Sequence, residues 1–390
     1  MGKSRIVVVD ALRGFALVGI LLLHALEHFD FFWPATYNPA VLSGLDKIIH
    51  DVTFFIFAGK SYAIFSVLFG FSFYIQMRNQ ELKGIDFRGR FAWRLVLLLV
   101  LGYLHTLIYM GDILMIYAIM GLPLILFYKV PTRFLVLVAA LLLLHVTRLY
   151  ELVYSFIDTD FTIQRDWGDW TRASNTFGGG TFWEVVKHNT SFAIITKIKW
   201  TVASARVYQL FGLFVVGMLL GRTGYFENLE SNKRKIWKNF FIGFIGMVLF
   251  QFVQKGLVNW ITINDTQKSL ITELAGIFTN MSMLVMWING FILLYLRFKK
   301  AQIFENLSLY GKMSLTSYVT QPLIGVPLFY GYGFGLYQYL GNTLSFLYAV
   351  VFLLLQLMFC KVWFKYYTYG PLEWLWRALT YFNFNLKMKR

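Results

Sequence analysis

The chain has 390 residues, of which 58% are hydrophobic, 19% aromatic and only 14% charged, and its mean hydropathy is +0.58. Soluble domains contain about 25% charged residues, so this composition indicates an integral membrane protein. The net charge of +16 would suggest nucleic-acid binding only if the basic residues formed a patch on a soluble domain. They lie between apolar runs instead, so we expect the lipid bilayer, and no nucleic acid, as a partner. The only cysteine, Cys360, excludes an internal disulfide framework.

Ten segments are apolar enough to be candidate transmembrane helices, each of which needs about 20 residues to cross a bilayer. Their approximate limits are 6–29, 52–77, 95–109, 113–128, 134–156, 207–222, 237–254, 271–296, 313–334 and 344–364. The third and fourth are joined by only three residues, which predicts a tight helical hairpin. The sequence therefore predicts an all-α, polytopic membrane protein of about ten transmembrane helices, with residues 1–390 forming a single transmembrane domain.

Lysine and arginine residues alternate between the two sides of this predicted bundle. The first outer loop carries only Lys47, whereas the loops after the second, fourth, sixth and eighth helices and the C-terminal tail are basic. The basic residues of these segments are Arg78, Lys83, Arg88, Arg90, Arg94, Lys129, Arg133, Arg222, Lys233, Arg234, Lys235, Lys238, Arg297, Lys299, Lys300, Lys312, Lys387, Lys389 and Arg390. Because basic loops stay in the cytoplasm, both termini are predicted to be cytoplasmic.

The long stretch at about 157–206 then falls on the outer side. It begins with a turn-prone part rich in Asp and Trp and continues, from 182 to 199, with mixed apolar and polar residues at roughly helical spacing. We expect this second part to lie on the membrane surface. Its tryptophans have two interpretations: they anchor the segment at the interface, as aromatic residues usually do there, or they stack against a substrate.

Ionisable residues inside or beside the predicted helices are the candidate functional groups, because burying them in a membrane is costly. All six histidines fall on the outer half: His24, His28, His50, His105, His145 and His188. His24 and His28 are predicted to share one face of the first helix, and Asp51 and Asp112 lie at the same depth. Histidine and carboxylate groups in a shielded site suit general acid–base catalysis. The same groups have a plainer interpretation as interfacial polar residues.

Metal binding is the less favoured alternative. His24 and His28 are one helical turn apart and both can reach one ion, but no strong metal-binding signature accompanies them, so no metal is expected. Nearer the cytoplasmic side, Asp10 and Arg13 have the spacing of a local ion pair, and Lys60 lies deep in the second helix. Gln321 belongs to a polar helix that either lines a substrate path or forms hydrogen bonds between helices.

Several short motifs together resemble the YeiB-like family of bacterial membrane proteins. They are DALRGFAL at 10–17, GK at 59–60 and FSVLFG at 65–70, His105 followed by GDIL at 111–114, glycines 212, 217 and 221, GKMSLT at 311–316, YGYG at 330–333, and GPLEWLWR at 370–377 with LT at 379–380. These motifs extend over nearly the whole chain. The resemblance implies a multi-pass protein of the bacterial cell membrane, in a family whose function is not known.

The first helix is also similar to that of the transmembrane acyltransferases, which include the acyltransferase-three proteins and the heparan-alpha-glucosaminide N-acetyltransferases. Their pattern has an Arg-Gly pair and a histidine eleven positions after the arginine, which correspond here to Arg13, Gly14 and His24. This similarity implies transfer of an acyl group from cytoplasmic acyl-CoA or acetyl-CoA, as co-substrate, to an outward-facing acceptor such as a sugar or envelope glycan.

The hypothesis from the sequence is therefore an acyl-CoA-dependent membrane acyltransferase. His24 or His28 is the expected general base, and His105, Asp112, His50 and Asp51 orient groups or bind substrate. Arg13, with Asp10, is expected on the donor side, and Lys60 and Gln321 between the two sides. A homo-oligomer is a further expectation. The alternatives are a transporter or flippase that moves a small molecule or lipid without covalent chemistry, and a membrane scaffold or sensor.

Overall fold

The computed structural model of the protein describes residues 6–389. Met1 to Arg5 and Arg390, which belong to the predicted cytoplasmic termini, lie outside this range. Within it, the only β-pairing is an isolated bridge between Tyr367 and Lys389, and nearly all other regular structure is α-helical. The predicted all-α fold is confirmed.

The helices follow one another along the chain with short connections. They are α1 (Val7–Leu26), α2 (Ser43–Phe57), α3 (Ser61–Glu81), α4 (Arg88–Thr106), α5 (Leu114–Phe127), α6 (Thr132–Leu143), α7 (Val146–Ile157), α8 (Trp170–Gly179), α9 (Phe182–Thr190), α10 (Phe192–Ala203), α11 (Arg206–Arg222), α12 (Lys233–Lys255), α13 (Asp265–Arg297), α14 (Gln302–Lys312), α15 (Ser314–Phe329), α16 (Asn342–Tyr366) and α17 (Pro371–Tyr381).

Five helical segments of the described chain are long and apolar enough to cross a membrane, and two bent helix pairs bring this to as many as seven. All ten predicted segments contain helix, but several are shorter or broken. The second is interrupted at Gly59 and Lys60, between α2 and α3, and the fifth at His145, between α6 and α7. The helices α5 and α15 have 14 and 16 residues. The count of ten full spans is therefore not confirmed.

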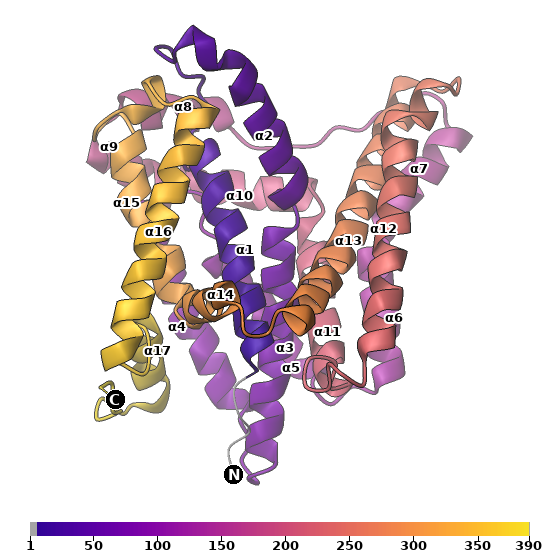
Figure 1. The fold of residues 1–390 in the computed structure, drawn as a ribbon. Coiled ribbons are helices and arrows are strands. Elements are labelled where there is room, and N and C mark those ends of the chain that lie inside the picture. Colours follow the sequence, from indigo (N-terminus) through magenta and orange to yellow (C-terminus); the bar gives the residue numbers. More distant parts are fainter. Residues whose placement is uncertain (1–5, 390) are drawn as a thin grey trace.

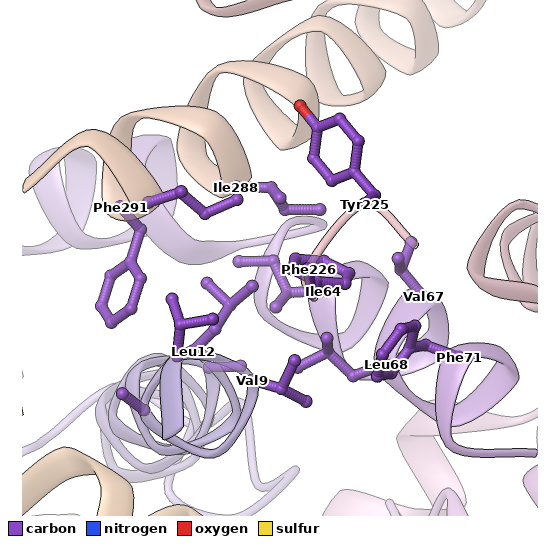
Figure 2. Packing of buried hydrophobic residues seen from close by; sticks show 14 of the residues in the cluster. Val9, Leu12, Ile64, Val67, Leu68, Phe71, Tyr225, Phe226, Ile288 and Phe291 are labelled. Atoms are coloured by element: carbon purple, nitrogen blue, oxygen red, sulfur yellow. The ribbon is translucent and has the colours of Figure 1, made fainter. Parts of the chain in front are cut away.

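The core of the molecule surrounds α1. Figure 2 shows Val9 and Leu12 of α1 packed against Ile64 and Leu68 of α3, with the aromatic ring of Phe226 between them and α13. Each Å² of apolar surface that such side chains remove from water stabilises the fold by about 25 cal/mol. The helix α1 also contacts α14, α15 and α16. It is therefore packed against helices on several sides.

Helices α1 and α17 define one end of the molecule, where α1 begins and where the chain also ends (Figure 1). We refer to this as the terminal end. The predicted outer stretch at about 157–206 forms three helices, α8, α9 and α10, and α8 and α9 lie at the opposite end (Figure 1). Their buried residues Phe177 and Val185 share a cluster with Phe29 and Tyr330. The stretch therefore packs against the residues at the far end of α1, and it is more buried than a helix lying on the membrane surface would be.

Candidate functional site

A buried histidine–aspartate pair joins the end of α4 to the turn before α5. His105 Nδ1 lies 2.8 Å from Asp112 Oδ1, and the two side chains are 2% and 0% exposed. The other carboxylate oxygen accepts the backbone N–H of Met115 at 3.2 Å. An ionised carboxylate can only accept, so Nδ1 carries the proton and Nε2 is left with a lone pair. Within the described chain, Nε2 is buried without a hydrogen-bond partner. This is the arrangement of a general base held by an orienting acid.

His24 of α1 lies beside this pair, across two tyrosine rings. Its ring centroid is 5.2 Å from that of Tyr109 and 6.2 Å from that of Tyr318. His105 contacts the same two rings, at 5.8 and 5.5 Å. His24 Nδ1 is also buried with no hydrogen-bond partner among residues 6–389. The structure thus brings together three of the four predicted catalytic residues, His24, His105 and Asp112.

The fourth, His28, is separated from them because α1 ends at Leu26 rather than at about residue 29. His28, Phe29 and Asp30 have φ angles of 46°, 59° and 66°, a left-handed turn made without glycine. In this turn His28 Nε2 donates to the carbonyl of Leu340 at 2.9 Å, and its ring stacks on Phe329. The expectation that His24 and His28 share one helix face is therefore wrong.

The left-handed turn costs about 1–2 kcal/mol for each non-glycine residue, so other contacts must hold it. The hydroxyl of Tyr330 donates to the carbonyl of Phe29 at 2.7 Å. The turn directs Asp30 toward the loop before α5, where its carboxylate and the hydroxyl of Tyr109 both lie beside Gly111. A Cβ on Gly111 would lie 1.9 Å from Asp30 Oδ2. Glycine in the GDIL motif therefore makes room for this carboxylate beside Asp112.

Four ionisable side chains lie next to the histidines on the side away from the terminal end, and we call them the outer charge cluster. They are Glu27, Asp30, Lys197 and Arg206, and each keeps part of its surface exposed. Lys197 donates to the backbone carbonyl of Asp112 at 2.9 Å. The guanidinium of Arg206 lies over the rings of Trp200 and Tyr62, at 4.2 and 4.7 Å.

The charges of this cluster face one another without direct contact. Arg206 acts electrostatically on both Glu27 and Asp30, and Lys197 on Asp30. Among the described residues, however, no nitrogen of Lys197 or Arg206 lies within 4.0 Å of a carboxylate oxygen of Glu27 or Asp30. A partly exposed cluster of separated opposite charges can accommodate a polar ligand between them.

Burial dominates the protonation of the two carboxyl groups. It raises the pKa of Glu27 from 4.5 to about 8, helped by the neighbouring charge of Asp30 and opposed by Arg206. Burial also raises the pKa of Asp30 from 3.8 to about 6, opposed by Lys197. Near neutral pH, Glu27 is therefore mostly protonated while Asp30 is mostly ionised.

A cavity of about 360 Å³ lies on the other side of the tyrosines. Its basic lining residues come from four helices: Arg13 of α1, Arg94 of α4, Lys312 of α14 and Arg377 of α17. Apolar residues of α3, α4 and α5 line the rest. The part of the cavity next to the histidines is bordered by Tyr318 and by Ile113 and Leu114, the two residues that follow Asp112. Its volume is in the usual range of ligand pockets, about 300–1,000 Å³.

Glu373 of the GPLEWLWR motif closes one wall of this cavity at the start of α15. Its carboxylate accepts the backbone N–H groups of Leu315 and Thr316, at 2.7 and 3.2 Å, and the hydroxyl of Thr316 at 2.7 Å. A carboxylate at a helix N-terminus satisfies unpaired N–H groups and interacts favourably with the helix dipole. The motif therefore joins α17 to α15 beside the cavity.

The remaining predicted residues lie in several environments. Arg13 borders the cavity, and it donates to Asp10 at 2.9 Å and to Ser72 at 3.1 Å. Lys60 is buried and donates to Asn280 of α13 at 3.0 Å, away from the cavity lining. Gln321 donates to Tyr310, which donates to Gln356. This last network connects α14, α15 and α16, so the hydrogen-bonding interpretation of that polar helix holds.

His50 and Asp51 form an exposed pair with each other on α2, at 3.1 Å, apart from the buried site. Over residues 6–389, no group of three or more His, Cys, Asp or Glu side chains is placed to hold a metal ion.

Sequence reasoning missed Glu27, Asp30, Lys197, Arg206 and Glu373. The two acids follow the first apolar run directly, which was a usable signal. Lys197 and Arg206 carried no such signal in the sequence. Nothing in the stretch at about 157–206 indicates that it packs against the end of α1 and the loop before α5.

Comparison with known proteins finds relatives that match over nearly the whole chain. A model described as "Protein of unknown function (DUF418)" matches residues 220–383. "Uncharacterized protein YxaH" of Bacillus subtilis is 26% identical over 404 residues, covering 98% of this chain and 95% of that protein. "Uncharacterized protein YeiB" of Escherichia coli is 26% identical over 396 residues, covering 97% and 96%. These matches bear out the resemblance to the YeiB-like proteins, whose function is not known. The family model covers the part of the chain that contains Lys312, Glu373 and Arg377. The similarity to these YeiB-like relatives also extends over His24 and the His105–Asp112 pair.

Proposed function

We propose that this YeiB-like protein is a membrane acyltransferase that takes an acyl group from acyl-CoA at the terminal end and passes it to an acceptor on the other side of Tyr318. One observation carries the proposal. Tyr318 borders the cavity and its ring also contacts both His24 and His105. A donor in the cavity would therefore place its thioester next to a histidine–aspartate pair.

The cavity suits an acyl-CoA because both basic and apolar side chains line it. Arg94, Lys312 and Arg377 would meet the anionic phosphates, for which guanidinium and ammonium groups are suited. Leu68, Leu95 and Leu98 would contact the thinner, less polar arm that carries the thioester. If basic segments mark the cytoplasmic side, the terminal end faces the cytoplasm, where acyl-CoA is present. The proposed location is the bacterial cell membrane.

The chemistry follows from the unpartnered nitrogen. His105 Nε2 removes a proton from the acceptor as the acceptor attacks the thioester carbonyl carbon, and Asp112 stabilises the resulting imidazolium. Tyr318 accepts the N–H of Ile113 at 3.2 Å, so its own proton is available to the developing oxyanion. The carbon–sulfur bond then breaks, and His105 returns its proton to the coenzyme A thiolate.

Blocking the cavity tests this proposal. Leu98 of α4 is buried against the cavity, whereas Leu104 of the same helix is 53% exposed on the outside of the bundle. We expect coenzyme A to raise the thermal unfolding midpoint of the wild type and of Leu104→Trp, but not that of Leu98→Trp. Release of thiol from acetyl-CoA should follow the same pattern.

The transporter alternative predicts a different outcome in the same protein. A flippase or carrier would move a substrate intact through proteoliposomes that contain no coenzyme A. Stabilisation by coenzyme A that is equal in Leu98→Trp and Leu104→Trp would contradict the donor site proposed here.

A further inference from the structure

The outer charge cluster lies next to the cavity, on the side of Tyr62. It begins where the donor cavity ends: Arg206 lies over one face of Tyr62, and Tyr62 borders the cavity. Lys197 is hydrogen-bonded to the backbone of Asp112. The carboxylate of Asp30 lies beside Gly111, as does the hydroxyl of Tyr109, whose ring contacts both histidines. A ligand in contact with the cluster is therefore adjacent to His24 and His105.

Two independent features indicate that this region is built for a ligand. The first is the pair of buried ring nitrogens, His105 Nε2 and His24 Nδ1, which lack partners within the described chain. Leaving such groups unsatisfied costs about 1–3 kcal/mol each. The second is the left-handed turn at residues 28–30, whose strain is retained where it directs Asp30 inward. Unsatisfied polar groups and backbone strain both concentrate at functional sites.

The signs of the charges define the ligand. Two cations, Lys197 and Arg206, and two carboxyl groups, Glu27 and Asp30, are close enough to influence one another but form no ion pair among the described residues. An anion alone would satisfy the cations and repel Asp30, and an ammonium alone would do the reverse. A molecule with both charges on one small head group would satisfy both sides.

We propose that the outer charge cluster binds a zwitterionic head group, with its phosphate at Lys197 and Arg206 and its primary ammonium at Asp30 and Glu27, and that this amine is the acyl acceptor. The proposal rests on the acyltransferase function proposed above. The same head group occurs on an aminophospholipid and on a soluble amino phosphate. The sugar acceptor implied by resemblance to other acyltransferases has no need of the paired cations and carboxyl groups.

The transfer balances as follows. The ammonium loses a proton, the amine nitrogen attacks the thioester carbonyl carbon, and an amide C–N bond forms as the C–S bond breaks. Of the two protons lost from nitrogen, one ends on the coenzyme A thiol and the other passes to solvent. His105 takes up protons in this sequence.

Binding can be tested without any catalytic assay, using O-phosphoethanolamine as the probe. We expect it to raise the unfolding midpoint of the purified full-length protein, whereas glycerol 3-phosphate and ethanolamine, each carrying charge of only one sign, should do so only at concentrations at least about tenfold higher. Asp30→Asn and Lys197→Gln should each weaken binding of the zwitterion by about tenfold or more. Asp51→Asn, which changes an exposed carboxylate on α2, should leave it unchanged.

A second arm separates the two sources of the head group. Protein in nanodiscs of phosphatidylethanolamine should be more stable than in nanodiscs of phosphatidylcholine if the ligand is a lipid, and Lys197→Gln should abolish the difference. Equal stability in both, with stabilisation by O-phosphoethanolamine, would identify a soluble acceptor.

The proposal is overturned if the single-charge probes stabilise the protein as well as the zwitterion does, or if none of the three has an effect. If Asp30→Asn does not fold, Lys197→Gln carries the test. Coenzyme A binding is measured in the same preparations: its loss would contradict the donor site, and its retention with no response to the zwitterion would contradict the acceptor site alone.

Discussion

Gly14 of α1 and Gly311 of α14 bring the backbones of their two helices into direct contact. A Cβ on Gly311 would lie 1.9 Å from the carbonyl oxygen of Asp10 and 2.8 Å from the nitrogen of Gly14. Only glycine permits this approach, which fixes Arg13 and Lys312 on opposite sides of the contact and at the edge of the same cavity. The glycines of the DALRGFAL and GKMSLT motifs therefore act in one interface.

Substituting either glycine should destabilise the protein. We expect Gly311→Ala to lower the unfolding midpoint in detergent clearly, by an amount equivalent to about 2 kcal/mol or more, because the clash is with backbone atoms. Gly89→Ala in α4 is the matched control. A Cβ there meets nothing within 4 Å, so this change should be neutral or slightly stabilising. Equal midpoints for the two variants would show that the α1–α14 contact is looser than described.

The carboxylate of Glu373 should stabilise the start of α15. Replacing it with glutamine removes the negative charge that accepts the N–H groups of Leu315 and Thr316. We expect Glu373→Gln to lower the free energy of unfolding by about 1–2 kcal/mol. Glu305→Gln, on the exposed side of α14, should have little effect. Coenzyme A binding would be weakened as well, if the cavity wall shifts with the helix.

Binding of coenzyme A should depend on the arginines of the cavity. Arg94→Gln and Arg377→Gln should each raise the dissociation constant by about tenfold, since each removes a charged contact to phosphate. Because the contacts are charged, the wild-type affinity should also fall with added salt. Arg88→Gln alters an exposed arginine paired with Asp86 and should bind normally. Affinities unchanged in all three variants would place the phosphates elsewhere.

Stability should depend on pH through Glu27. The folded protein holds the pKa of this group at about 8, against 4.5 for an ordinary glutamate. A raised folded-state pKa stabilises the protein at low pH, and this contribution is lost as the pH rises through the folded value. We therefore expect the unfolding midpoint of the wild type to fall relative to that of Glu27→Gln between about pH 5 and pH 9. Parallel curves would show that Glu27 is not held in a buried site.

The sequence was sufficient for the features that depend on composition and local pattern. Hydropathy located α1, α12, α13 and α16, and the rule that ionisable groups in a membrane serve function singled out His24, His105 and Asp112. The first two of these lie 81 positions apart in the sequence. They meet because α1 and α4 both border the turn before α5.

The remaining features arise from tertiary contacts that no local pattern records. A run of left-handed residues at His28, Phe29 and Asp30 contains no glycine to signal it, so His28 was misplaced and Asp30 overlooked. Lys197 and Arg206 belong to α10 and α11, which bend by 72° where they join. That bend turns a segment expected on the membrane surface toward the histidines. Where the chain breaks its helices, hydropathy alone cannot place the side chains.

The central claim is tested most directly by a rate: how fast the purified protein releases coenzyme A thiol from acetyl-CoA when O-phosphoethanolamine is present. Mass spectrometry follows the acylated product in the same reaction. His105→Gln and Asp112→Asn should each reduce this rate by about a hundredfold or more, because the first removes the general base and the second removes the carboxylate that orients it and stabilises its charged form. His50→Gln and Asp51→Asn alter an exposed pair of the same chemistry and should retain the wild-type rate. Turnover that is undiminished in Asp112→Asn, or absent from the wild type while coenzyme A binds, would contradict the account.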